Sequence, residues 1–270
     1  MSILCAILKF IYIKLKNFFE YFLLCKNRLY KGLMYMNFNI IKIDKKYYSY
    51  KLENDCEYMN YEYKDFFYKD FGKSILGRKI YFIRLGIGKN KKLIISGFNA
   101  NDYSVSLAIM CFIEKFLLKM KNKEIYIGYN PEDLWNDYSF YFIPMLNPDG
   151  IDLYLRDKGV MLDNRYDYIW KPYEDNLDIW KANIRGVDLL YNNKSLWTKA
   201  YKYLVDKKKC NPGPCGYPGI NECSESEIIY LNKFKNMIKF NKIMYIECGK
   251  RVGKIDYKYL LNQIENIVLN

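Results

Sequence analysis

The segment KLIISGFNAND, residues 92–102, joins an apolar run to a short polar turn. Residues 92–98 have the length and the β-branched side chains of a buried strand. Apolar side chains at helical spacing over residues 104–121 predict that a helix follows directly. α/β enzymes often place metal ligands or phosphate-binding amides where a strand runs into a helix, so this turn is the first candidate site.

The rest of the chain continues the same alternation of strands and helices. Apolar runs predict further strands at 79–86, 139–146 and 243–249, and helices are expected over 224–237 and 254–268. Ser224 and Glu227 have the spacing of a capping box for the first of these helices. The sequence NPDG after residue 146 predicts a turn. Residues 151–220 predict a long loop region that is polar and aromatic. Residues 37–71 have no clear assignment. The order predicts a three-layer α/β/α domain with a mixed, mostly parallel sheet.

Composition limits the chemistry available to this chain. Its 270 residues suffice for one large domain, and no repeat or linker divides residues 36–270. It contains no histidine, which excludes every catalytic triad that needs imidazole and removes the commonest zinc ligand. The cysteines at 210, 215 and 223 suggest a zinc site, but the paired ligands of structural zinc sites usually lie closer together in sequence. We therefore favour independent reduced thiols and a cytoplasmic location.

Residues 1–35 form a separate N-terminal extension. Their apolar side chains recur at helical spacing and lysines interrupt the apolar runs, which predicts a basic amphipathic helix and no transmembrane segment. One interpretation is a helix that lies on a membrane surface, and the others are a helix packed on the domain or an upstream extension with Met34 or Met36 as the true start.

The net charge of +13 favours an anionic surface as partner. The alternative is that solvated lysines reflect the general excess of Lys, Asn, Ile and Tyr in this chain. No nucleic-acid motif accompanies the basic residues.

Six ordered segments together resemble one enzyme family. They are GKSILGRKIYFIRLG (72–86), SGFNAND (96–102), YFIPMLNPDGIDL (141–153), WKANIRGVDL (180–189), PGPCGYPGINECSESE (212–227) and IMYIECG (243–249). The set resembles the zinc carboxypeptidase family, and WKANIRGVDL with the PGPCGYPG segment is most similar to the bacterial branch that cleaves γ-D-glutamyl-diaminopimelate bonds in peptidoglycan. The resemblance implies a carboxypeptidase-like fold, a zinc ion and hydrolysis of a peptide bond by activated water.

The positions that carry zinc in the family hold other residues here. The resemblance places its first His at Asn99, its Glu at Asp102 and its second His at Glu247. These side chains offer only oxygen, which suits Ca²⁺, Mg²⁺ or Mn²⁺ better than Zn²⁺. The expectation is therefore that no zinc cofactor binds, with a weak site for a harder ion as the alternative.

The substrate-binding positions are changed as well. The family Asn and Arg that hold a substrate carboxylate fall on Leu190 and Tyr191, and the Arg of the first turn falls on Asn101. Tyrosine lacks the two-pronged donor geometry with which arginine binds carboxylates. Two family positions are kept: Lys181, a basic residue near the reacting carbonyl, and Asp188, which in the family orients a zinc-bound imidazole.

The family general base lies on a late strand, and the resemblance implies that this strand and its helix are missing after Asn270. No catalytic residue is therefore predicted. The sequence predicts an inactive carboxypeptidase-like protein. The alternatives are a peptidase that uses a non-zinc ion, a non-catalytic binder of peptidoglycan peptides or of an anionic surface, and a decaying reading frame.

Overall fold

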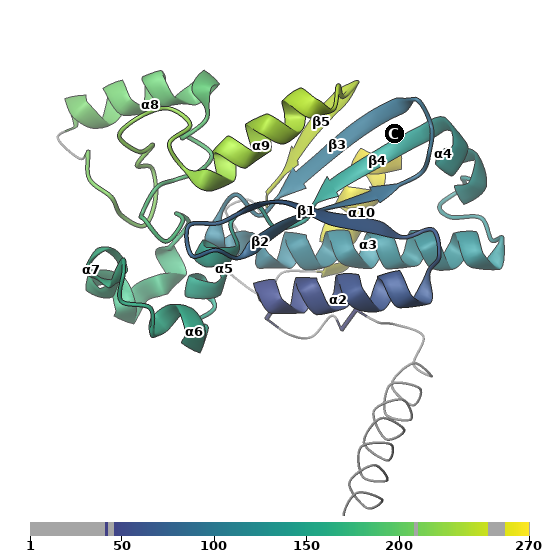
Figure 1. Ribbon diagram of the computed structural model, residues 1–270, viewed down its shortest axis with the longest axis horizontal. Helices are drawn as coiled ribbons and strands as arrows, with labels where there is room; N and C mark the ends of the chain where they lie inside the picture. Colours follow the sequence, from purple (N-terminus) through teal and green to yellow (C-terminus); the bar gives the residue numbers. More distant parts are fainter. Residues whose placement is uncertain (1–40, 43–45, 208–209, 248–256, 270) are drawn as a thin grey trace, which may run out of the picture. The chain divides into compact units, whose positions relative to one another are not determined.

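The computed structural model describes residues 41–42, 46–207, 210–247 and 257–269 (Figure 1). The predicted amphipathic helix over residues 1–35 lies outside these residues, and so does the segment 248–256. No helix of the described part is both long enough and apolar enough to cross a membrane.

A mixed sheet forms the centre of the described part, with strand order β1-β2-β4-β3-β5. Its strands are β1 Phe67–Lys73, β2 Lys79–Leu85, β3 Asn90–Ser96, β4 Tyr138–Ile143 and β5 Lys242–Ile246. The pairings β1–β2 and β2–β4 are antiparallel, whereas β3 pairs in parallel with both β4 and β5. The prediction of a mixed sheet is confirmed, and the candidate metal positions Asn99, Asp102 and Glu247 follow the carboxyl ends of the parallel strands β3 and β5.

Helices cover both faces of this sheet (Figure 1). Helices α2 Ser49–Glu62, α3 Tyr103–Asn122 and α10 Tyr257–Leu269 lie on one side, and α9 Ser226–Met237 lies on the other. Leu93, Ile94 and Ile95 of β3 are all fully buried, because a strand covered on both faces needs apolar side chains in succession. The three-layer α/β/α prediction is confirmed.

The apolar cluster between the sheet and α9 fixes this arrangement. The buried members of this cluster include Leu93 and Ile95 of β3, Ile80 of β2, and Leu231 and Phe234 of α9. Each such side chain contributes roughly 1.5–3 kcal/mol when it leaves water. The cluster therefore holds the strand ends, and the turns that follow them, in fixed positions.

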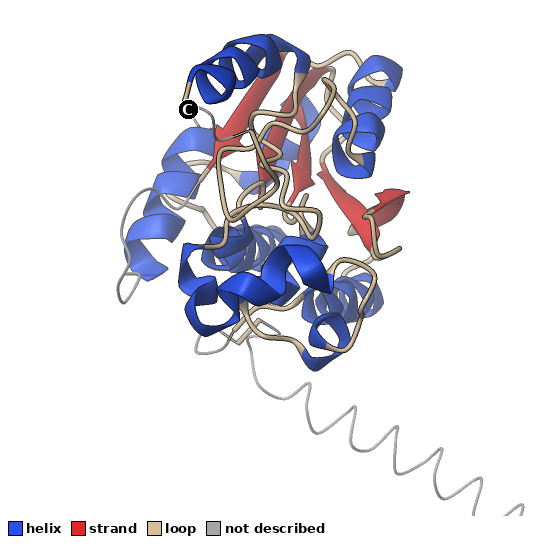
Figure 2. Ribbon diagram, turned by 90° about the vertical axis from the view of Figure 1, so that its left-hand side faces the viewer, coloured by secondary structure: helices blue, strands red, loops and turns tan. Residues whose placement is uncertain are grey.

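Two regions of the sequence contain more regular structure than expected. Residues 37–71, left without assignment, include α2 and most of β1. The expected loop region 151–220 contains the rest of α5 Pro148–Tyr154, then α6 Lys158–Met161, α7 Asp167–Trp170, a 3₁₀ segment at Lys171–Ile179 and α8 Lys194–Asp206. Figure 2, which views the left-hand side of Figure 1, shows the short helices and their connecting loops in front of the strands.

The sequence NPDG, expected to form a turn, opens a helix instead. Asn147 is the N-cap of α5, and its side-chain oxygen accepts a hydrogen bond from the N–H of Gly150 at 3.0 Å. Pro148 occupies the first helical position, where its missing N–H costs nothing. The turn prediction recognised where the strand ends but not that a helix begins there.

The predicted capping box at Ser224 and Glu227 is wrong. Helix α9 begins at Ser226, and its N-cap is Glu225. The Ser224 hydroxyl donates to the Glu225 carboxylate at 2.9 Å, and Glu227 is fully buried. Ser224 and Glu227 therefore do not form the reciprocal pair of hydrogen bonds that defines a capping box.

Candidate functional site

The turn after β3 is pressed against the turn after β4. Gly97 has a positive φ of 68°, and a Cβ there would lie 2.9 Å from the Cα of Met145. The N–H of Leu146 donates to the carbonyl of Ser96 at 3.1 Å, and the Ser96 hydroxyl donates to the carbonyl of Pro144 at 2.6 Å. Glycine at 97 is required because both its conformation and this close approach exclude a side chain.

Asn147 joins three segments of the site. Its backbone N–H donates to the Gly97 carbonyl at 2.8 Å. Its side-chain Nδ2 donates to the carbonyls of Phe98 at 3.0 Å and Ala182 at 3.2 Å. The N–H of Ala100 completes the junction by donating to the Lys181 carbonyl at 2.9 Å. The Asn99 turn and the segment that carries Lys181 are therefore held side by side.

Asn99 precedes a single 3₁₀ turn, Ala100–Asp102, and Asp102 is its last residue. Both residues are buried, at 8% and 1% exposure. The Asp102 carboxylate accepts a hydrogen bond from the backbone N–H of Asn99 at 3.3 Å. Asp102 therefore stabilises the turn that leads into α3, which is the role of a capping side chain.

Asn101 lies between them on the same turn. Its side-chain Oδ1 is buried and has no hydrogen-bond partner among the described residues. Leaving a buried acceptor without a donor costs roughly 1–3 kcal/mol. The turn therefore carries a polar group that does not contribute to the stability of the fold.

Asp188 is buried and is held by two backbone N–H groups. Gly216 donates to Oδ2 at 2.9 Å and Leu190 donates to Oδ1 at 3.2 Å. Burial raises the pKa of Asp188 above its usual value, while these two donors and the Lys181 ammonium oppose the rise. Nearby Glu247 raises the pKa further. The carboxylate thus orders the loop of Gly216 by accepting its N–H.

Glu247 follows the end of β5, next to the turn after β3. Ser96 and Ile246 are paired in register, so Asn99 and Glu247 leave the same edge of the sheet. Glu247 is exposed, and its charge acts on both Asp188 and Tyr191. Burial, then Asp188 and Glu247, raise the pKa of Tyr191.

The structure therefore groups Lys181, Asp188, Tyr191 and Glu247 as electrostatic neighbours. Asn99 and Asp102 lie beside Lys181 through the Ala100 contact. Leu190 contributes its backbone N–H to Asp188 and offers no polar side chain. Cys215, which the sequence analysis named only as a possible zinc thiol, is exposed next to Tyr191.

The donor set at this edge consists of one amide and carboxylates. Zn²⁺ sites in proteins are built mainly from thiolate and imidazole, with carboxylate as a third ligand. Oxygen donors alone suit Ca²⁺, Mg²⁺ or Mn²⁺. Across the part of the chain that the structure describes, no three Cys, Asp or Glu side chains converge as a metal site.

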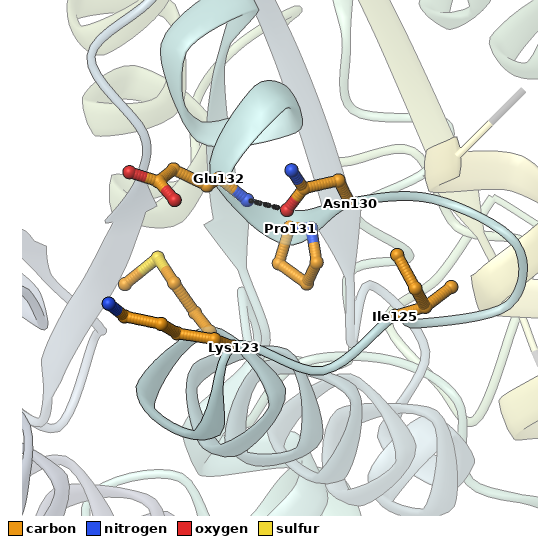
Figure 3. Close-up of a pocket in the computed structure, with 6 residues that line it drawn as sticks. Lys123, Ile125, Asn130, Pro131 and Glu132 are labelled. Atoms are coloured by element: carbon orange, nitrogen blue, oxygen red, sulfur yellow. Dashed lines mark hydrogen bonds between the residues drawn. The ribbon is translucent and has the colours of Figure 1, made fainter.

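A small hollow lies elsewhere and does not belong to this site (Figure 3). It has a volume of about 150 Å³ and is lined by Met120, Lys123, Ile125, Asn130, Pro131 and Glu132. The Asn130 side chain there accepts the N–H of Glu132 at 3.1 Å and so caps α4 Pro131–Asp137. Helix α3 starts at the candidate site and runs for 20 residues, or roughly 30 Å, before it reaches this hollow.

Comparison with known proteins assigns the family. The zinc carboxypeptidase family model matches residues 52–253, which is most of the chain and includes every site position named above. The chain belongs to the zinc carboxypeptidase family. The resemblance drawn from the six sequence segments is thereby confirmed.

Two curated relatives come from bacteria. The uncharacterized protein YqgT of Bacillus subtilis is 32% identical over 163 residues, covering 58% of this chain and 42% of that protein. Gamma-D-glutamyl-L-diamino acid endopeptidase 1 of Lysinibacillus sphaericus is 27% identical over 183 residues, covering 67% of this chain and 45% of that protein. The chain thus spans less than half the length of the curated relatives it matches.

Solved structures agree on the fold. Carboxypeptidase A from Helicoverpa armigera superposes with a TM-score of 0.54 at 15% identity, covering 77% of this chain and 47% of that one. Thrombin-activatable fibrinolysis inhibitor superposes with a TM-score of 0.52 at 17% identity, covering 83% of this chain and 57% of that one. The family fold is therefore present in the described part of the chain.

Proposed function

We propose that this chain is a member of the zinc carboxypeptidase family that does not hydrolyse peptides with zinc. The observation that carries the proposal concerns the side chains at the first two zinc-ligand positions of the family, Asn99 and Asp102. Asn99 offers a neutral amide, and the Asp102 carboxylate is bound to the backbone of its own turn. Neither residue supplies the imidazole or the free carboxylate that a hydrolytic zinc ion requires.

The third ligand position adds to this argument. Glu247 is exposed and lies near two other acidic or ionisable groups, Asp188 and Tyr191. A carboxylate in water is a weak and unselective ligand compared with an imidazole held by a second residue. Asp188 has no histidine to orient and instead holds the Gly216 loop.

Substrate binding is the second function that this site would have to perform. Leu190 and Tyr191 replace the pair that binds a terminal carboxylate in the family, and Tyr191 is only partly exposed. A single hydroxyl cannot provide the paired charged N–H groups that make arginine selective for carboxylates. We infer that a peptide substrate would not be aligned for attack even if a metal were supplied.

A peptidase assay tests the proposal. The purified chain is incubated with a γ-D-glutamyl-L-diamino acid peptide, the substrate type named for the L. sphaericus relative, in the presence of Zn²⁺, Mn²⁺ or Ca²⁺. We expect no release of product with any ion. Turnover with Zn²⁺ overturns the proposal, and turnover with Mn²⁺ or Ca²⁺ alone supports a peptidase built on oxygen ligands.

A second candidate function is non-catalytic binding of a cell-wall peptide. The observation that favours it is the group formed by the kept residues Lys181 and Asp188 with Glu247, which offers one positive and two acidic side chains close together. A diamino-acid peptide carries both an amine and carboxylates. Calorimetric titration of that peptide into the wild-type chain and into K181M tests this candidate, and equal heats for both chains would contradict it.

A further inference from the structure

Helix α8, Lys194–Asp206, follows the segment of Leu190 and Tyr191 and buries none of its residues completely. Each of the other long helices buries several side chains; α9, for example, buries Ile228, Leu231 and Phe234. Figure 1 shows α8 at the left-hand end of the molecule, away from the strands. This helix therefore has a face that the described body does not cover.

The inner side of α8 rests on the loop that precedes α9. The indole N–H of Trp197 donates to the Gly219 carbonyl at 3.1 Å, and the ring of Trp197 stacks on that of Tyr201 with centroids 4.8 Å apart. Asn193 caps the helix by accepting the N–H groups of Ser195 and Leu196. These contacts fix the orientation of α8, so its outer face is defined.

The outer face combines lysines with exposed apolar side chains. At 100° per residue, Lys199 and Lys202 project between Tyr203 on one side and Val205 on the other. Tyr203 is 61% exposed and Val205 is 48% exposed. Among the described residues, neither of these two lysines forms an ion pair.

The local charge is strongly positive. Residues 194–209 contain six lysines and a single acid, Asp206. Two of these lysines, Lys208 and Lys209, lie outside the described residues. A cluster of four to eight basic residues on an amphipathic helix has the composition of a site for anionic lipid headgroups.

We propose that the outer face of α8 docks onto an anionic lipid surface. The lysines supply charge complementarity, and Tyr203 and Val205 lie where they can enter the headgroup region. A soluble acidic polymer would use the lysines but would gain little from the two apolar side chains. The proposal concerns the solvent-facing side of α8, which does not include Asp188 or Glu247, and it does not depend on the absence of peptidase activity.

Vesicle co-sedimentation of the full chain tests this inference. Vesicles of phosphatidylcholine alone are compared with vesicles that also contain phosphatidylglycerol, at low and high salt. We expect binding only to the second kind, weakened by salt. In K199E/K202E, binding should fall at least about 25-fold, since each surface lysine contributes about fivefold.

Two further variants distinguish the possible outcomes. K69E/K73E makes the same charge change on exposed lysines of β1 and should bind within about threefold of wild type. Y203S/V205S should bind lipid more weakly while it stays folded by circular dichroism. Equal losses in both lysine variants, or unchanged binding in K199E/K202E, overturn the proposal. A second outcome also overturns the proposal: Y203S/V205S binds lipid as well as wild type does, and heparin competes fully. That outcome would assign the face to a soluble polyanion.

Discussion

Asn147 donates a hydrogen bond from its side-chain Nδ2 to the carbonyl oxygen of Ala182 at 3.2 Å, although the two are 35 residues apart. The same nitrogen donates to the Phe98 carbonyl at 3.0 Å. One buried amide thereby connects the end of β4, the turn that carries Asn99 and the segment that carries Lys181. The candidate site is assembled by this residue and not by any of the family ligand positions.

Replacing Asn147 with alanine should lower the free energy of unfolding by roughly 2–4 kcal/mol, because buried carbonyl oxygens lose their donor. Urea unfolding followed by circular dichroism measures the change. The matched control is N211A, at an exposed asparagine, which should stay within about 0.5 kcal/mol of wild type. Equal stability of N147A and N211A would show that Asn147 does not join these segments.

Asp55 should make the domain less stable as the pH rises. Burial raises the pKa of Asp55 to about 7, although the Tyr47 hydroxyl donates to its carboxylate at 2.7 Å. In the unfolded chain Asp55 has its usual pKa of 3.8, so the unfolded state loses this proton at a lower pH than the folded state does. Stability is therefore lost as the pH rises from about 4 to about 7. This loss amounts to at most about 1.4 kcal/mol per pH unit, and it should be absent in D55N. The measurement is the free energy of unfolding of D55N and of the exposed control D65N from pH 5 to 8. The same dependence on pH in both variants would contradict the prediction.

Glu227 predicts a second pH dependence at higher pH. Burial, followed by the charges of Asp149 and Glu225, raises the pKa of Glu227 to about 8 from 4.5. Its Oε1 has no hydrogen-bond partner within the described structure, while Ser226 donates to Oε2 at 3.1 Å. The neutral acid is thus favoured in the fold, and stability is lost as the pH rises from about 4.5 to about 8.

The substitution E227Q imitates the neutral acid. It should leave stability near pH 5 almost unchanged and raise it relative to wild type at pH 8 to 9. The control E222Q, at an exposed position, should follow the wild-type curve. Melting temperatures of E227Q, E222Q and wild type across this pH range test the prediction. A melting temperature of E227Q below that of wild type at pH 9 would mean that Glu227 is charged in the fold.

The sequence predicted the parts of the fold that have strong local patterns. Strands β2, β3 and β4 and helix α3 follow from uninterrupted apolar runs or clear helical spacing. Helix α2 was missed although its buried residues Leu52, Cys56 and Met59 have helical spacing, because so few apolar residues mark that face in a tyrosine-rich stretch. Helix α8 was missed although its side chains are arranged amphipathically, because the polar and aromatic stretch around it favoured a loop.

For the site, sequence reasoning named the positions but could not supply the contacts. It could not show that Asp102 bonds to its own turn, that Asp188 holds Gly216, or that Asn147 joins the segments. Ser224 and Glu227 were assigned to a capping box because their spacing fits one, and the burial of Glu227 leaves no local signal. Cys215 was considered only as a possible zinc thiol, and its position beside Tyr191 depends on the loop that Asp188 orders.

The most direct test of the central claim is a calorimetric zinc titration of two chains. One is the wild type, and the other is N99H/D102E/E247H, which restores the two imidazoles and the longer carboxylate of the family. We predict no saturable zinc binding to the wild type and an affinity roughly 100-fold or more higher in the triple variant. Stoichiometric zinc binding by the wild type, as tight as that of the variant, would contradict the account.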